Sequence, residues 1–313
     1  MSAQGSSPAI RLEGARVGLV VNPAAGAGDA AARSLGLQAG LRSAGAEVVP
    51  LSARTAGTAL AVASRAVRDG LVDVLVVAGG DGMAHLGVNA CAGTDVPLGI
   101  VALGTGNDIA AGLGLPVHDA AASLAMICGG AVRAVDAGRV DGPEHRPWFG
   151  GTLYAGFDAL VNARANGWRW PRGQSRYTLA VVRELPTFTA IPYAITVDGA
   201  RTETEAMLVV VANAASYGGG MQVTPAARMD DGLLDVLILS RVRRSEFLRV
   251  FPRVFTGEHV DHPAVTILRG AEVRLEADGI TAWADGEPFH PTPLTARVVP
   301  GAVRALVPGG DAP

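Results

Sequence analysis

A buried strand that runs directly into a glycine-rich turn is the feature that most constrains this fold. The strand is Val74-Leu-Val-Val77, an apolar run rich in β-branched residues, and the turn after it is Gly79-Gly-Asp-Gly82. Such a run is typical of a central strand in a parallel sheet covered on both faces. Because glycine lacks a Cβ, the turn can adopt positive φ and present its N–H groups to an anion. The stretch predicts a phosphate site at a strand end, with Asp81 on the metal side.

Two further strands end in glycine turns of the same kind. Val17–Val21 runs into Asn22-Pro23-Ala-Ala-Gly26, and Val96–Ala102 runs into Leu103-Gly-Thr-Gly-Asn-Asp108. In an open α/β sheet, ligands bind outside the carboxyl ends of the strands. The three turns together therefore predict one phosphate-binding edge.

The pattern of the chain changes after Asp136. Before it, short strands alternate with Ala-rich helical segments such as Ala30–Ala44 and Thr58–Asp69, which predicts a doubly wound sheet. After it, strand-like runs are spaced by turns, with helical stretches near Gln174–Leu185 and Arg244–Phe255, which predicts an all-β second domain. The expected strands are Trp148–Tyr154, Tyr193–Val197, Met207–Val211, Leu233–Leu239, Val265–Leu268, Glu272–Leu275 and Ile280–Ala284. The predicted domains are residues 15–137 and 138–299.

Composition excludes several classes of protein. The formal net charge is −3, whereas a nucleic-acid-binding protein needs a strongly basic surface. The sequence contains no Lys, which excludes a Walker A site and a protein-kinase site, because both use a phosphate-contacting Lys. Two cysteines, Cys91 and Cys128, fit a reducing cytoplasm. We find neither a secretory signal nor an apolar run of the ~20 residues that span a membrane, so we expect a soluble cytoplasmic protein.

The three turns resemble the catalytic domain of the soluble diacylglycerol kinase family, bacterial lipid kinases related to NAD kinases. The family pattern of Asn-Pro-x-x-Gly, GGDGT and GTxND stands here as Asn22–Gly26, Gly79–Met83 and Gly104–Asp108. The resemblance implies ATP and Mg²⁺ as cofactors and a Rossmann-like nucleotide domain followed by a β-sandwich, with a cleft between them. It also implies that residues from about 300 to 308 return to the first domain. The implied nucleotide-binding residues are Asn22, Pro23, Gly26, Thr55, Gly79, Gly80, Asp81, Gly82, Met83, His85, Gly104, Thr105 and Asn107.

Two sets of metal ligands follow from the same resemblance. Asp81, Asp108 and Asp136 match the family's magnesium network, although Asp136 alone is equally typical of a turn. The run from Asn213 to Asp235, with YGGG and DDGLLD, is similar to a family segment that holds a structural magnesium ion. On this chain its ligands are Asp231 and main-chain oxygens of Arg228 and Leu233, a set that suits a hard cation. A plain turn before the strand Leu233–Leu239 is the alternative.

The stretch Ala284-Asp-Gly-Glu-Pro288 carries the catalytic base by resemblance. A carboxylate that accepts the proton of an attacking hydroxyl suits phosphoryl transfer. Asp-Gly between two strands is also the strongest short hairpin signal, so a simple turn is the alternative. The sequence leaves open whether Asp285 or Glu287 is the base.

The chain departs from the family pattern in the helix after the GGDG turn. Met83, His85 and Leu86 stand where the family has Thr, Asn and Glu, so a hydroxyl expected on the nucleotide phosphates is missing. His85 is either a substitute polar partner or a structural residue. The alternatives to a diacylglycerol kinase are a sphingoid or ceramide kinase, a non-catalytic lipid-binding relative, and an NAD kinase. The last normally has an Asn-Glu pair, which is absent here.

The candidate lipid segment is Trp168-Arg-Trp-Pro-Arg172, which interleaves aromatic and basic residues. This mixture is typical of a headgroup boundary, and a buried aromatic cluster is the alternative. With the preceding Gly156–Asn166 it resembles actinobacterial diacylglycerol kinases, which implies diacylglycerol as the acceptor. The expected partners are therefore ATP and a lipid at the inner face of the membrane, without nucleic acid, and a homodimer is left open.

Overall fold

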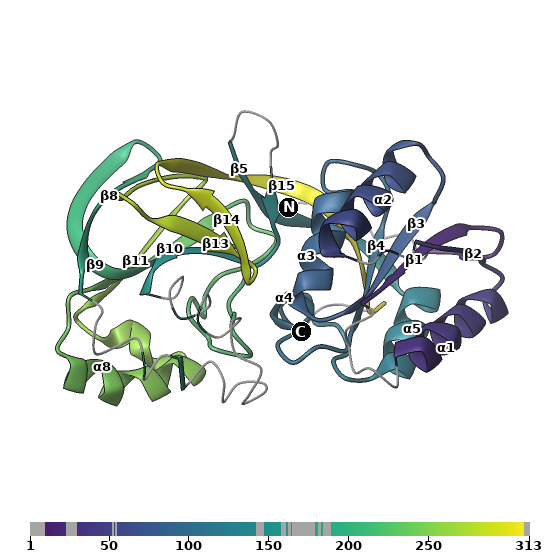
Figure 1. Ribbon diagram of the computed structural model, residues 1–313, viewed down its shortest axis with the longest axis horizontal. Helices are drawn as coiled ribbons and strands as arrows, with labels where there is room; N and C mark the ends of the chain where they lie inside the picture. Colours follow the sequence, from purple (N-terminus) through teal and green to yellow (C-terminus); the bar gives the residue numbers. More distant parts are fainter. Residues whose placement is uncertain are drawn as a thin grey trace, which may run out of the picture. The chain divides into compact units, whose positions relative to one another are not determined.

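The computed structural model describes residues 10–22, 30–51, 53, 55–141, 147–157, 161, 164, 179–180, 183 and 189–309. These residues form two compact units (Figure 1). One comprises the residues up to Val135 together with those from Pro300 on, and the other comprises Asp136–Val299. Among the helices that the structure describes, none combines the length and apolar character that crossing a bilayer requires.

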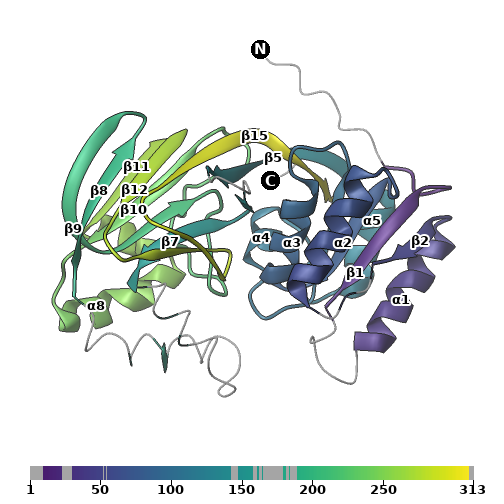
Figure 2. The same cartoon turned by 45° about the horizontal axis from the view of Figure 1, so that its top comes forward.

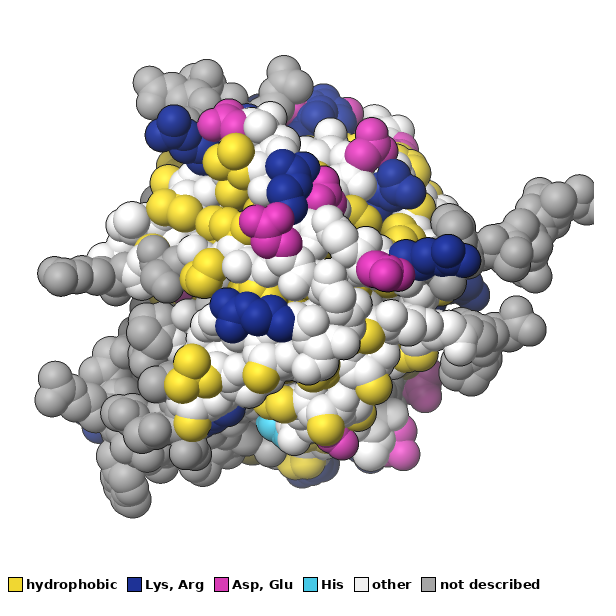
Figure 3. Space-filling model, turned by 90° about the vertical axis from the view of Figure 1, so that its right-hand side faces the viewer, with side chains coloured by type: hydrophobic (Ala, Val, Ile, Leu, Met, Phe, Trp, Pro, Cys, Tyr) yellow, Lys and Arg dark blue, Asp and Glu magenta, His cyan; other side chains and the backbone are white. Residues whose placement is uncertain are grey.

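The first unit is a parallel sheet with helices on both faces. Its central strand β3 (Val74–Gly79) is buried at every residue and pairs with β1 (Arg16–Val21) and β4 (Leu98–Ala102). Helices α1 and α5 pack on one face, and α2 and α3 on the other (Figures 1 and 2). The remaining elements are α1 (Ala30–Ser43), β2 (Glu47–Pro50), α2 (Ala56–Arg68), α3 (Asp81–Cys91), α4 (Asp108–Gly112) and α5 (Ala120–Gly129). Where α1 and β2 reach the surface, basic and acidic side chains are interspersed (Figure 3).

The second unit is a curved antiparallel sheet structure with an apolar cluster on each side of its longest strand, β9 (Ala200–Ala212). Val209 and Val211 pack in one cluster, and Leu208 and Val210 pack in the other, because side chains alternate along a strand. The other strands are β6 (Trp148–Phe149), β7 (Thr152–Gly156), β8 (Ile191–Val197), β10 (Leu234–Ser240), β11 (Val265–Gly270), β12 (Glu272–Glu276), β13 (Thr281–Ala284) and β14 (Glu287–Pro291). This unit also contains the helices α8 (Arg244–Val250), η1 (Phe251–Phe255) and η2 (Glu258–Asp261).

The predicted fold class, an α/β domain followed by a β-rich domain, is confirmed. Several element predictions are corrected. The expected strand Trp148–Tyr154 is broken at Gly150 and Gly151 into β6 and β7. The expected helix Arg244–Phe255 ends as an α-helix at Val250 and continues as a 3₁₀ helix with Pro252 in its first turn. Most of Gln174–Leu185 lies outside the described residues.

Two long strands were not predicted. They are β5 (Ala131–Val140) and β15 (Leu294–Val307), and each contributes residues to both units. After Pro300, β15 belongs to the first unit, where Ala305 pairs in parallel with Leu98 of β4. The sheet of the first unit therefore includes the last part of β15.

Candidate active site

The carboxyl ends of β1, β3 and β4 lie side by side because the three strands are neighbours in the sheet. Asn22 N–H donates to the carbonyl of Ala78 at 3.1 Å, and Leu103 N–H donates to the carbonyl of Gly79 at 2.8 Å. These bonds fasten the residues that follow β1 and β4 to the end of β3. Pro23 and Gly26, the other predicted residues of the first turn, lie outside the described residues.

The second and third turns touch through their backbones. A Cβ on Gly104 would lie 2.2 Å from the Gly80 Cα, so no larger residue fits at this position. Asn107, with φ of 61°, closes the third turn: its Oδ1 accepts from Gly104 N–H at 2.9 Å and its Nδ2 donates to the Gly104 carbonyl at 2.8 Å. The Asn107 amide therefore shapes the turn, while Thr105 is exposed on it.

Two predicted metal-binding carboxylates converge on Gly106. A Cβ at that glycine would lie 2.3 Å from Asp81 Oδ2 and 3.4 Å from Asp108 Oδ2. Asp81 begins α3, and its Oδ1 accepts from Ile109 N–H at 3.2 Å. Within the described residues, no three His, Cys, Asp or Glu side chains gather to hold a metal ion by themselves. Mg²⁺ is commonly bound by one or two carboxylates, with water and phosphate oxygens as its other ligands. The carboxylates of Asp81 and Asp108 therefore fit this ion.

The side chains after the GGDG turn differ in their surroundings. Met83 is 9% exposed, and its Cγ would lie 2.5 Å from a Cβ on Gly79, so it packs as an apolar residue beneath the turn. His85 Nε2 lies 3.2 Å from Asn89 Nδ2, one helical turn away. The predicted Thr55 caps α2, where its hydroxyl oxygen accepts from Thr58 N–H at 3.2 Å.

Arg33 is a candidate that the sequence analysis did not name. It lies in the first turn of α1, is half-buried, and lines a small hollow together with Asn22, Gly79 and Leu103. A basic residue therefore lines this hollow at the ends of β1 and β3. The absence of Lys was the available signal, since an arginine must then supply the positive charge at a phosphate site.

In the second unit, Asp285 is bound by main-chain donors. Its carboxylate accepts from Gly150 N–H at 2.8 Å, Gly151 N–H at 2.9 Å and Thr152 N–H at 2.9 Å. Asp285 and the following glycine have positive φ and join β13 to β14, so the hairpin turn is present. Glu287 begins β14, is exposed, and makes no hydrogen bond or ion pair with its side chain among the described residues.

Asp136 lies in the second unit and is nearly buried. Its Oδ2 accepts from Gly232 N–H at 2.7 Å, and its carbonyl accepts from Asn213 Nδ2 at 2.9 Å. The same amide nitrogen donates to the Gly150 carbonyl at 2.8 Å. Asp136 and Asn213 thus hold the DDG turn in place, and a magnesium role for Asp136 stays a prediction.

The predicted structural magnesium ligands share one turn with a guanidinium. Asp231 Oδ1 accepts from Leu233 N–H at 3.1 Å, and Asp231 Oδ2 is ion-paired with Arg269, which also reaches Asp235 Oδ1 at 3.1 Å. Burial raises the pKa of Asp235, and the neighbouring Arg269 opposes that shift. Magnesium at Asp231 would compete with Arg269, so the set of Arg228, Asp231 and Leu233 stays a prediction.

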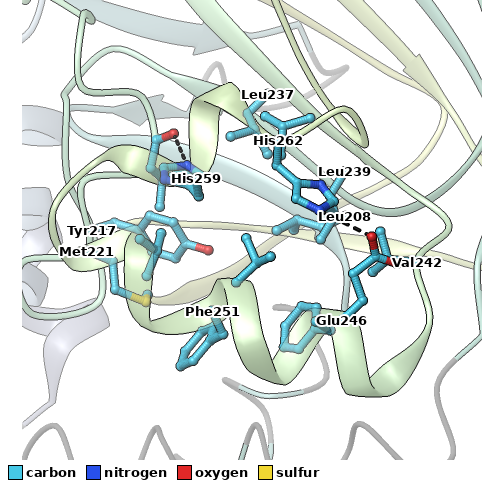
Figure 4. Close-up of a pocket in the computed structure, with 15 residues that line it drawn as sticks. Leu208, Tyr217, Met221, Leu237, Leu239, Val242, Glu246, Phe251, His259 and His262 are labelled. Atoms are coloured by element: carbon cyan, nitrogen blue, oxygen red, sulfur yellow. Dashed lines mark hydrogen bonds and ion pairs between the residues drawn. The ribbon is translucent and has the colours of Figure 1, made fainter.

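An apolar cavity of about 80 Å³ lies in the second unit between the helices α8 and η1 and the strands β9 and β10 (Figure 4). Tyr217 of the YGGG motif lines the cavity, together with Phe247 of α8 and Phe251 of η1. At its edge, His262 Nε2 lies 3.3 Å from Glu246 Oε1. His259 Nε2 lies 3.0 Å from the Val223 carbonyl, and burial lowers the His259 pKa. The predicted lipid segment with Trp168 and Trp170 lies outside the described residues.

Comparison with known proteins identifies the family. Residues 16–140 match the diacylglycerol kinase catalytic domain, and residues 151–307 match the YegS C-terminal NAD kinase β-sandwich-like domain. A diacylglycerol kinase of Mycobacterium tuberculosis is 37% identical over 300 residues, 95% of this chain and 97% of the relative. The chain belongs to the diacylglycerol kinase family. The membership predicted from the three turns is confirmed.

Other members of the diacylglycerol kinase family support the same assignment. A YegS-like lipid kinase of Pseudomonas aeruginosa is 30% identical over 86% of this chain and 88% of its own. The crystal structure of a diacylglycerol kinase from Bacillus anthracis matches with a TM-score of 0.70 at 22% identity, covering 93% of this chain and 96% of that one. At this identity the structural match shows the shared fold.

Proposed function

We propose that this protein uses ATP and Mg²⁺ to phosphorylate the free hydroxyl of diacylglycerol, which yields phosphatidic acid. The observation that carries the proposal is the pair of carboxylates, Asp81 and Asp108, that converge on Gly106 beside the contact between Gly80 and Gly104. It supports a phosphate and metal site at the strand ends of a kinase-family domain. Relatives that are diacylglycerol kinases by name, including the one at 37% identity, support diacylglycerol as the acceptor.

The nucleotide domain has the groups that an ATP triphosphate needs. Backbone N–H groups of the two touching glycine turns suit phosphate oxygens, because no Cβ keeps an anion away. Asp81 and Asp108 would hold the magnesium ion, which when bound neutralises charge that builds up on the transferred phosphoryl group. Arg33 lines the hollow together with Asn22 and Gly79. We assign its guanidinium group to a phosphate of ATP.

The acceptor hydroxyl must lose a proton as it attacks, and we assign that proton to Glu287. Asp285 already accepts three main-chain hydrogen bonds, which tie its carboxylate to Gly150, Gly151 and Thr152. Glu287 follows it by one turn residue and is exposed. Asp285 is then a positioning residue that fixes the hairpin, and Glu287 is the general base of the transfer.

The lipid acceptor brings acyl chains that must leave water. The cavity between the two helices α8 and η1 and the strands is lined mostly by apolar side chains, with Glu246 and His262 at its edge. Such a surface suits part of an acyl chain and offers few groups for a sugar or nucleotide. We therefore assign the chain of the acceptor to this cavity, in the same domain as Glu287.

One incubation separates this activity from its alternatives. The purified protein is given labelled ATP and Mg²⁺ with diacylglycerol, sphingosine, ceramide or NAD in parallel. Labelled phosphatidic acid in the wild type, and its loss in Glu287→Gln, supports the proposal. Labelled NADP would instead indicate an NAD kinase, and a labelled sphingoid product a different lipid kinase. No product from any acceptor, despite lipid binding, would indicate a non-catalytic relative.

A further inference from the structure

Arginines in the second unit divide into two groups. Between residues 189 and 299, most of them are paired with a carboxylate at 3.8 Å or less: Arg201, Arg228, Arg241, Arg269, Arg274 and Arg297. The exceptions are Arg243, Arg244, Arg249 and Arg253, which are all exposed and form no ion pair among the described residues. Arg243 is the N-cap residue of α8, Arg244 and Arg249 lie on α8, and Arg253 lies on η1.

The same segment is amphipathic. Phe247, Val250 and Val254 line the apolar cavity, so the helices form one of its walls. On the outside, Leu248 is 50% exposed and stands one helical turn from Arg244 and next to Arg249. Glu246, the acidic residue of α8, pairs with His262. We call the exposed side, formed by Arg243, Arg244, Leu248, Arg249 and Arg253, the α8–η1 face.

The charge pattern of this face differs from that at one end of the first unit. At the end of the first unit that carries α1 and β2, basic and acidic side chains are interspersed (Figure 3). There Arg16 pairs with Asp73 at 2.6 Å and Arg65 pairs with Asp69 at 3.1 Å. The whole chain has a net charge of −3. The unpaired arginines on the α8–η1 face suit an anionic partner, and the exposed leucine among them suits a partner that also has an apolar layer.

We propose that the α8–η1 face docks on a membrane surface that contains anionic phospholipids. Arginines near such a surface gain from its negative potential, and an apolar side chain between them can enter the headgroup layer. Docking would bring α8 and η1, whose inner sides line the cavity, to the membrane from which a lipid must come. The purpose of docking rests on the proposed function, whereas the binding itself does not.

The test uses the full chain and vesicles of phosphatidylcholine with or without phosphatidylglycerol. The variant R243Q/R244Q/R249Q/R253Q removes the unpaired arginines, and R11Q/R42Q/R65Q/R68Q removes the same charge from exposed sites in the first unit. The wild type should sediment with phosphatidylglycerol vesicles and be released by salt, because the attraction is screened. The face variant should lose about fivefold in partitioning for each arginine, and the control variant should bind like the wild type.

The inference is overturned if the face variant binds like the wild type, or if both variants lose the same affinity. It is also overturned if an oligonucleotide of equal charge binds as tightly as the anionic vesicles. Phosphorylation of a short-chain diacylglycerol dispersed in detergent distinguishes a failure of docking from a failure of the proposed function. If docking is right, the face variant keeps its turnover there. If the wild type has no turnover there but binds vesicles through these arginines, the proposed function fails and docking stands.

Discussion

Asp81 and Asp108 point their carboxylate Oδ2 atoms at the same glycine, Gly106, from the first turns of two different helices. The glycine has no Cβ between them, so the two oxygens share a space that a small hard cation can occupy. This relationship brings the second and third glycine turns of the first unit together at Gly106.

Gly106→Ala tests that shared space. The new methyl group would lie 2.3 Å from Asp81 Oδ2, so the carboxylate must move. We expect the magnesium concentration needed for half-maximal activity to rise at least tenfold, with little change in thermal stability. Gly36→Ala is the matched control, because a Cβ there meets nothing within 4 Å. Equal magnesium dependence in the two variants would contradict a metal role for this pair.

Arg33→Ala tests the guanidinium in the hollow beside Asn22 and Gly79. Charge-assisted hydrogen bonds typically contribute about 1.5–3 kcal/mol, so affinity for ATP and ADP should fall roughly tenfold or more. Adenosine has no phosphate, and its binding should not change. Arg33→Lys should restore part of the ATP affinity, and Arg68→Ala on the exposed side of α2 serves as control. Titration calorimetry measures all of these, and an equal loss for adenosine would place Arg33 away from the phosphates.

Asp285→Asn tests the positioning role of the hairpin carboxylate. Asparagine keeps one acceptor oxygen, but its NH₂ group would face a main-chain N–H of Gly150, Gly151 or Thr152. A buried donor left without an acceptor costs about 1–3 kcal/mol, so the free energy of unfolding should fall by that amount. Glu287→Gln should leave it unchanged, because Glu287 is exposed. Denaturant unfolding of both variants measures this. An Asp285→Asn variant with the same free energy of unfolding as the wild type would contradict the positioning role of Asp285.

His259 makes the second domain sensitive to acid. Burial lowers its pKa below the ordinary 6.5, so the folded state favours the neutral ring and the unfolded state binds the proton more readily. The stabilisation is therefore full above pH 6.5 and is lost as pH falls toward the lowered folded value. Thermal melts of the wild type and His259→Gln across this window should converge at low pH. A constant difference between them would contradict the assignment.

Local signals explain why much of the first domain could be predicted. The apolar run before Gly79 gives the buried strand β3, and the glycines after β3 and β4 mark the turns that meet at Gly80 and Gly104. Family membership followed from the same residues. The packing of Met83 against Gly79 could not be predicted, because the sequence motif does not specify which side chains are buried beneath the turn.

The rest depends on contacts between distant residues. Asp285 binds Gly150, Gly151 and Thr152 across more than 130 residues of sequence, so no local pattern separates its role from that of Glu287. Arg33 belongs to the site because α1 packs beside the strand ends. The strand β5 was missed because the change of pattern at Asp136 falls inside it, and β15 was missed although Gly301 lies within it, because tertiary pairing rather than a local pattern holds both strands.

We infer that Glu287 accepts the proton of a lipid hydroxyl while the first domain holds MgATP. The most direct test measures phosphatidic acid formation and ATP affinity for the wild type and Glu287→Gln in parallel. Loss of a general base lowers the rate by about 10²–10⁴, so turnover should fall by that factor with near-normal ATP affinity and unchanged stability. Nearly full turnover in Glu287→Gln would contradict the claim.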